Sequence, residues 1–143
     1  MTGAMVQATR RELRATQRRQ APRGEDDHRR VEGLTSALAQ ALFDIHGLEG
    51  WRVEWCDYIE GKAGWCWPTS RVITLSRHHL LEAKARNIRE CLLHEIAHAL
   101  VGDGDHDEEW WNKLLELGGD GIWVMKDGRV TFARPKPGEG VQA

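Results

Sequence analysis

The sequence has few cysteines, no long apolar run and little net charge. Its three cysteines, Cys56, Cys66 and Cys91, are an odd number without a CxxC pair, which argues against a disulfide framework and against a zinc ribbon. Unpaired cysteines are typical of a reducing compartment. No N-terminal stretch resembles a signal peptide, and no run is long and apolar enough to cross a bilayer. We therefore expect a cytoplasmic protein with no membrane partner.

The chain length and the charge distribution predict one folded domain between two tails. A chain of 143 residues is large enough for a single core. The net charge is -2, but residues 1–30 carry eight Arg against four acidic residues, whereas residues 31–143 carry a net charge of -6. We expect a basic, flexible tail over residues 1–27, a domain over residues 28–133 and a flexible tail over residues 134–143. The basic end makes DNA a candidate partner.

Apolar periodicity predicts an α+β fold. An amphipathic helix is expected over residues 28–46, packed through an apolar face spaced by three and four residues. The residues of that face are Val31, Leu34, Leu38, Leu42 and Ile45. Alternating or β-branched residues at 51–56, 64–67 and 71–75 predict a short three-stranded antiparallel or mixed sheet. Four tryptophans of this segment are expected to pack in the core: they are Trp51, Trp55, Trp65 and Trp67.

The second half of the chain predicts two more helices and a hairpin. The longest helical pattern runs over residues 86–101 and ends at Gly102. Asp105 is a candidate N-cap for a further helix that ends near Leu117. Asp127-Gly128 predicts the turn of a C-terminal hairpin formed by residues 122–125 and 129–132. Before these elements, His78 and His79 are expected to lie on the surface.

His94-Glu95-Ile96-Ala97-His98 is the motif that points to chemistry. Positions i and i+4 of a helix lie nearly above one another, so His94 and His98 can reach the same metal ion from one helical face. Glu95 lies beside them, close enough to contact a water molecule at that ion. The pattern is typical of zinc peptidases, with Glu95 as the general base. Cys91, one turn earlier, is interpreted as a buried structural thiol.

A catalytic zinc site requires three protein ligands and one position for water. Seven residues separate His98 from His106, and Gly102 and Gly104 between them allow the chain to turn back after the helix. His106 is therefore the candidate third ligand. Nearby carboxylates are alternatives that the sequence leaves open: Asp105, Asp107, Glu108 and Glu109.

Three stretches together resemble the SprT-like zinc metalloprotease family. The first is Ala63-Gly64-Trp65-Cys66 leading to the strand at 71–76, the second is the segment 92–99 around the HExxH motif, and the third is His106-Asp107-Glu108-Glu109-Trp110. The resemblance covers about residues 35–117. It implies a small zincin-like α+β metallopeptidase core, a Zn²⁺ ion held by His94, His98 and His106, and Glu95 as the general base.

The resemblance also implies a function, with two departures from the family pattern. Relatives degrade proteins that are crosslinked to DNA or act near nucleic acid, so a protein or peptide substrate is expected. Asp107 replaces the glycine of the family's third-ligand motif, and the scattered cysteines do not form the zinc ribbon of many bacterial members. The basic residues 10–30 are then the expected contact with DNA.

Peptide hydrolysis is the predicted reaction. The strand at 71–75 is a candidate edge for pairing with an extended substrate, and Tyr58 is the candidate residue for stabilising the oxyanion. Two other functions fit the same motifs. One is a regulatory peptidase similar to the ImmA/IrrE group, whose third ligand is typically acidic, and the other is a non-catalytic, DNA-associated zinc-binding module.

Overall fold

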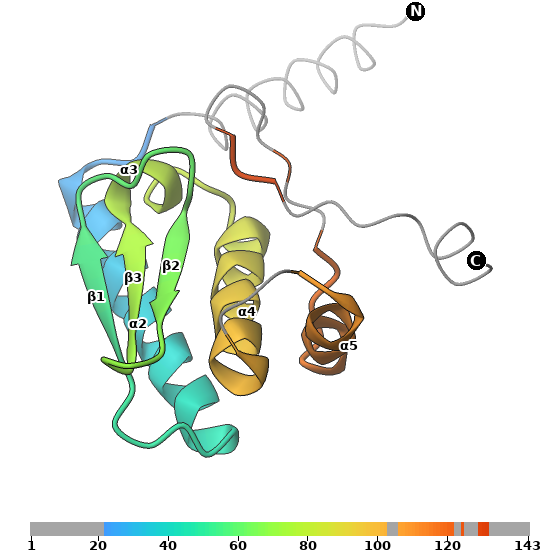
Figure 1. Ribbon diagram of the computed structural model, residues 1–143. Coiled ribbons are helices and arrows are strands. Elements are labelled where there is room, and N and C mark those ends of the chain that lie inside the picture. Colours follow the sequence, from blue (N-terminus) through green and yellow to red (C-terminus); the bar gives the residue numbers. More distant parts are fainter. Residues whose placement is uncertain (1–21, 103–105, 122–123, 125–128, 132–143) are drawn as a thin grey trace, which may run out of the picture.

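The computed structural model describes residues 22–102, 106–121, 124 and 129–131, and it has an α+β architecture (Figure 1). Four helices and three strands are formed by these residues, in the order α2 (Glu25–Ile45), β1 (Arg52–Cys56), β2 (Gly64–Trp67), β3 (Val72–Ser76), α3 (Arg77–Leu80), α4 (Ala85–Val101) and α5 (Glu108–Glu116). The helices expected at 28–46, at 86–101 and up to Leu117 are present, as are the strands expected at 51–56, 64–67 and 71–75, with bounds that differ by a few residues. None of the described helices has the length and apolar character needed to span a bilayer.

The sheet is mixed, with the strand order β1-β3-β2. Strand β1 runs parallel to β3, whereas β2 runs antiparallel to it, with Gly64 opposite Leu75 and Trp67 opposite Val72. Both edges of β3 are thus occupied. The expectation that this strand offers an edge to a substrate is wrong, because it is the middle strand, and β2 is the edge strand that lies toward α4 (Figure 1).

Helix α2 is correctly predicted as a helix, but its buried face matches the predicted one only in part, since Val31 and Leu42 pack against the core as expected. Thr35, Ala39 and Phe43 are buried, whereas Leu34 is 62% exposed and Ile45 is 73% exposed. The small side chains of Thr35 and Ala39 permit a close approach of the helix to the core. On the same side the indole N–H of Trp55 donates a hydrogen bond to Ser36 Oγ at 2.9 Å.

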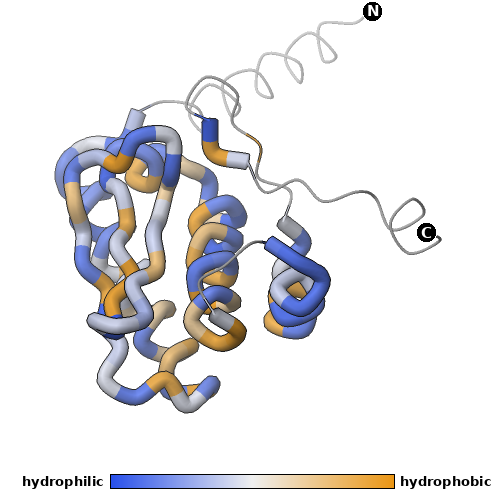
Figure 2. The backbone as a smooth tube through the Cα atoms, in the orientation of Figure 1, coloured by the Kyte–Doolittle hydropathy of each residue, from blue (hydrophilic) through white to orange (hydrophobic). Residues whose placement is uncertain are grey.

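Helix α4 packs on both the sheet and α5. Cys91, Leu92 and Ile96 belong to the main core with residues of β3 and α2. Leu93 and Ala97 belong to a smaller apolar cluster with Trp110 and Leu114 of α5. Apolar residues accordingly recur along α4 and β3 (Figure 2). The helix ends where expected, since the backbone N–H of Gly102 bonds to His98 O at 2.8 Å and Gly102 has a φ of 116°.

Three local expectations are corrected by the structure. The N-cap of α5 is Asp107, whose carboxylate accepts a hydrogen bond from the Trp110 N–H at 3.0 Å, while the expected cap, Asp105, lies outside the described residues. His79 is buried rather than on the surface, with its Nδ1 2.8 Å from Ser76 Oγ.

The third correction concerns the tryptophans of the sheet region. Trp51 is buried as expected, but Trp55 and Trp65 are only partly buried and Trp67 is 50% exposed. The alternation of side chains along β2 explains the difference, because Trp65 and Trp67 lie on the face opposite to the buried Gly64 and Cys66.

The segment after α5 returns to the core. Val124 and Thr131 form an antiparallel bridge, which agrees with the expected hairpin, although its Asp127-Gly128 turn lies outside the described residues. Val130 is 2% exposed and packs in the main core. This contact brings residues 129–131 to the same side of the molecule as the HExxH motif.

Candidate metal centre

Helix α4 presents His94, Glu95 and His98 on its inner surface. All three side chains are buried, although each can carry a charge. The rings of His94 and His98 have centroids 5.1 Å apart, as expected for positions i and i+4 of one helix. The Nδ1 of His98 lies 3.4 Å from Gly102 O and can donate a weak hydrogen bond to it. This bond leaves Nε2 as the nitrogen that faces the third histidine.

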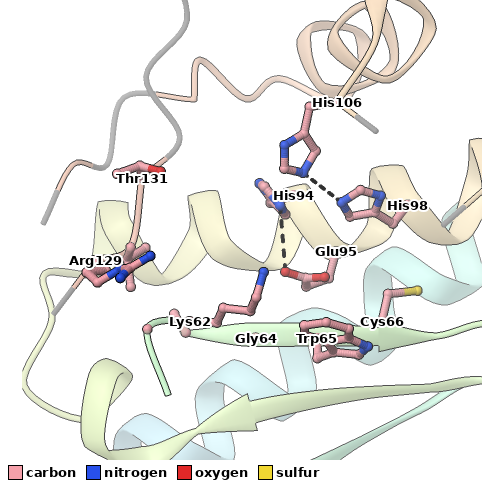
Figure 3. A pocket seen from close by; sticks show the side chains of 13 residues that line it. Lys62, Gly64, Trp65, Cys66, His94, Glu95, His98, His106, Arg129 and Thr131 are labelled. Carbon is pink, nitrogen blue, oxygen red and sulfur yellow. Dashed lines mark hydrogen bonds and ion pairs between the residues drawn. The ribbon is translucent and has the colours of Figure 1, made fainter. Parts of the chain in front are cut away.

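His106 comes from the segment between α4 and α5 and completes a cluster of three imidazoles. Its Nε2 lies 3.0 Å from Nε2 of His98, and its ring centroid is 4.7 Å from that of His94 (Figure 3). One ligand atom from each residue lies within 4.8 Å of the other two. Two nitrogens on a tetrahedral zinc, each about 2.05 Å from the ion, are about 3.3 Å apart. Three imidazoles in this arrangement are therefore a donor set that fits a metal ion.

The indole ring of Trp110 packs against the imidazole rings of all three histidines. It is 1% exposed, and its ring centroid lies 4.6 Å from that of His94, 5.3 Å from that of His98 and 4.4 Å from that of His106. The hydrogen bond from Trp110 N–H to Asp107 starts α5 directly after His106. The same turn thus orients the histidine and the indole on which it rests.

Electrostatics favour the ligand form of His94. Burial lowers its pKa well below the usual value, and the positive charges of His98, His106 and Lys62 lower it further. A neutral imidazole is the form that binds a metal. Burial, followed by the charge of Glu95, instead raises the pKa of Cys91 well above its usual value. This thiol stays protonated, in agreement with a structural role.

Glu95 lies between the histidines and strand β2. Its Oε2 is 3.9 Å from Nε2 of His94. The missing side chain of Gly64 makes room for it, since a Cβ at this position would lie 3.2 Å from Glu95 Cγ and 3.2 Å from Cys91 Sγ. Strand β2 can therefore lie close to Glu95, because Gly64 has no side chain at this point.

The histidines and Glu95 open into a cavity of about 280 Å³. One wall is formed by residues 61–66 at the start of β2, and another by Arg129, Val130 and Thr131 (Figure 3). The second wall could not be predicted from the sequence, because nothing in the pattern of residues 129–131 connects them to a motif more than 20 residues earlier. Lys62 was not predicted either, because its only signal is its position just before a strand that leads to the motif.

The sequence matches the SprT-like family over residues 31–121. The chain belongs to the SprT-like family. Among solved structures, the fold is similar to the metallopeptidase zymogen abylysin of Pyrococcus abyssi, with a TM-score of 0.50 and 19% identity over 58% of this chain and 78% of that one. No curated protein matches the sequence.

The positions of the candidate residues from the sequence can be compared with this cluster of histidines. Within the described part of the chain, the metal-type cluster consists of His94, His98 and His106 and contains no carboxylate. Asp107 caps α5 instead, and Asp105 lies outside the described residues. Tyr58 does not line the cavity, because its ring stacks on that of His79 with centroids 5.5 Å apart. The expectation that it stabilises an oxyanion has no support from this position.

Proposed function

We propose that this SprT-like protein is a zinc-dependent metalloendopeptidase. The observation that carries the proposal is the convergence of three imidazoles beside a buried carboxylate at the wall of an open cavity. His94, His98 and His106 would hold the ion, and three nitrogen ligands are typical of zinc sites that keep a position for water. When bound, zinc supplies Lewis-acid activation of water and of the scissile carbonyl group.

Glu95 is the proposed general base and acid. Its carboxylate faces the cavity beside His94 and can accept a proton from the attacking water, then deliver it to the amine of the leaving group. Burial at 4% exposure keeps this proton transfer away from bulk solvent. Gly64 leaves room for this side chain, since a Cβ at that position would lie 3.2 Å from Glu95 Cγ.

The proposed substrate is an extended peptide segment that adds to the sheet at β2. Gly64, Trp65 and Cys66 line the cavity, and β2 pairs on one side with β3. A strand edge beside a reactive centre binds an extended chain through main-chain hydrogen bonds that do not depend on sequence. This position replaces the earlier expectation that residues 71–75 receive the substrate.

Metal analysis and cleavage of an unfolded protein test the proposal. We expect about one zinc ion per chain, and Glu95→Gln should retain the zinc and lose cleavage, because the amide cannot accept the proton. His106→Ala should lose zinc, whereas Glu109→Ala, which removes an exposed alternative ligand from the same turn, should keep both zinc and cleavage. Cleavage by Glu95→Gln at the wild-type rate would overturn the assigned role.

An association with DNA is a separate proposal that rests on the basic residues of the N-terminal end. Residues 1–21 lie outside the described part of the structure. If these residues bind DNA, then DNA should accelerate cleavage of a DNA-bound protein at low salt, and the acceleration should decrease steeply as salt is added. Equal rates with and without DNA would count against this partner.

A further inference from the structure

Two cationic side chains lie at the same end of the cavity, on the side away from His98. Lys62 precedes β2 and Arg129 belongs to the wall formed after α5, and both line the cavity (Figure 3). The residue before Lys62 lies beside Arg129, because a Cβ built on Gly61 would lie 3.7 Å from Arg129 Cβ and 3.9 Å from its Nε. Segments that are far apart in the sequence thus place two positively charged side chains on the lining of one cavity.

No acidic side chain of the described residues forms an ion pair with either cation. Lys62 Nζ instead lies 4.7 Å from the centroid of the Trp65 ring. The acidic residue that lines the cavity is Glu95, which is 4% exposed and lies at the metal centre. The cavity therefore has one end with excess positive charge that solvent and ligands can reach.

Arg129 is held at this end by its neighbour and by its backbone. Val130 is 2% exposed in the main core, so the backbone next to Arg129 is anchored. Arg129 has a φ of 68°, in the left-handed region that non-glycine residues rarely adopt. Such a conformation persists where the surrounding structure imposes it.

Lys62 also lines the same cavity as His94 and Glu95 of the metal centre. An anionic group bound between Lys62 and Arg129 would therefore lie next to the proposed site of bond cleavage. Paired cations bind carboxylates through charge-assisted hydrogen bonds, and the fork of an Arg guanidinium matches the two oxygens of a carboxylate.

We propose that Lys62 and Arg129 form a carboxylate-binding subsite that selects peptide substrates with an anionic group close to the cleaved bond. The carboxylate can belong to an Asp or Glu side chain or to the C-terminus of the peptide. This inference rests on the proposed peptidase function for its biological meaning, but binding at the subsite can be measured without cleavage.

The binding test uses the full chain with Glu95→Gln and short fluorescent peptides in anisotropy titrations. Peptides with both ends blocked carry either Glu or Gln at one central position, and a third peptide carries Gln with a free C-terminal carboxylate. We expect the Glu peptide, the free-carboxylate peptide or both to bind about 5- to 10-fold more tightly than the blocked Gln peptide. The arm that gains affinity identifies the source of the carboxylate.

Variants of the two cations then locate the effect. Lys62→Ala and Arg129→Ala should each reduce the preference about 3-fold or more, and the double variant should abolish it. Lys62→Arg and Arg129→Lys keep the charge and should retain most of the preference, which separates loss of charge from loss of folding. Lys84→Ala removes one exposed positive charge outside the cavity and should leave the preference unchanged.

The outcomes distinguish this inference from the proposed function. Preference in binding, with no cleavage by the wild-type protein, would retain the subsite and overturn the peptidase. Cleavage by the wild-type protein without any preference for a carboxylate, in binding or in rate, would overturn the subsite and retain the peptidase. If Lys62→Ala and Arg129→Ala weaken binding of a short oligonucleotide but leave the ratio of Glu to Gln peptides unchanged, the cations serve phosphate and the inference is wrong.

Discussion

The contact between β2 and Glu95 predicts that Gly64→Ala damages both stability and catalysis. A Cβ at this position would lie 3.2 Å from Cys91 Sγ, 3.2 Å from Glu95 Cγ and 3.3 Å from Leu75 Cδ2. All three neighbours are buried, so they must shift by a few tenths of an ångström within a packed core. The φ of Gly64 is not in the left-handed region, and an alanine therefore meets no backbone penalty.

Two opposing free energies set the size of the effect on folding. Overpacking of a core by a methyl group costs about 1–3 kcal/mol. Replacing glycine by alanine reduces the entropy of the unfolded chain and returns about 0.4–1 kcal/mol. We expect a net loss of about 0.5–2 kcal/mol in the free energy of unfolding. Because a displacement of 1 Å at a catalytic group can cost about 100-fold, a shift of a few tenths should reduce cleavage by about 3- to 10-fold.

Urea unfolding, zinc content and cleavage of an unfolded protein measure these effects together. Zinc content should not change, because His94 and His98 are not among the atoms nearest to the added Cβ. Gly33→Ala is the matched control, since nothing lies within 4 Å of its Cβ on the exposed side of α2, and it should stabilise the protein by about 0.5–1 kcal/mol. Wild-type stability and activity in Gly64→Ala would refute the argument that this glycine makes room for Glu95.

Two further predictions concern buried ionisable groups. Glu90 is 3% exposed and accepts hydrogen bonds from Asp120 N–H at 3.0 Å and Gly121 N–H at 2.9 Å. Glu90→Ala should therefore lower the free energy of unfolding by about 2–4 kcal/mol. A loss of stability no greater than that caused by Glu116→Ala, at an exposed position, would contradict this prediction. In the metal-free protein the pKa of His94 is lower in the folded than in the unfolded state, so the unfolded chain binds the additional proton. His94 should therefore leave the free energy of unfolding unchanged above about pH 6.5 and lower it at more acidic pH, by at most about 1.4 kcal/mol per pH unit. His94→Gln should remove this part of the pH dependence, measured by urea unfolding with a chelator present.

The sequence was sufficient for most local structure and for the centre of the site. Helix periodicity located α2 and α4, and the HExxH spacing brought His94 and His98 together, because both depend on local geometry. His106 was found through the number of ligands that zinc requires, and the structure places it with the other two. Its neighbour Asp107 was considered as a ligand, whereas its carboxylate caps α5.

The errors concern relations between elements. The apolar stripe of α2 contains Leu34 and Ile45, but burial follows Thr35 and Ala39 because small residues permit close packing. The order of strands was not predicted, although Val72, Ile73 and Leu75 are buried in β3 and a strand with several apolar residues in a row is typical of the middle of a sheet. The presence of Lys62 and Arg129 in one cavity depends on Val130 entering the core, and no local pattern indicates that Val130 is buried there.

The three imidazoles belong to two separately packed parts of the molecule. His94 and His98 belong to α4, whereas His106 lies just before α5 and packs on Trp110 of that helix, which docks through the smaller apolar cluster. An ion that binds all three histidines would link α4 to the start of α5. Metal binding and docking of α5 are reciprocally coupled: if the docked helix increases metal affinity, the bound metal stabilises docking by the same free energy. Loss of the ion should therefore destabilise the docking of α5 first. Hydrogen exchange of the backbone amides of α5 should then become faster before exchange in the sheet changes.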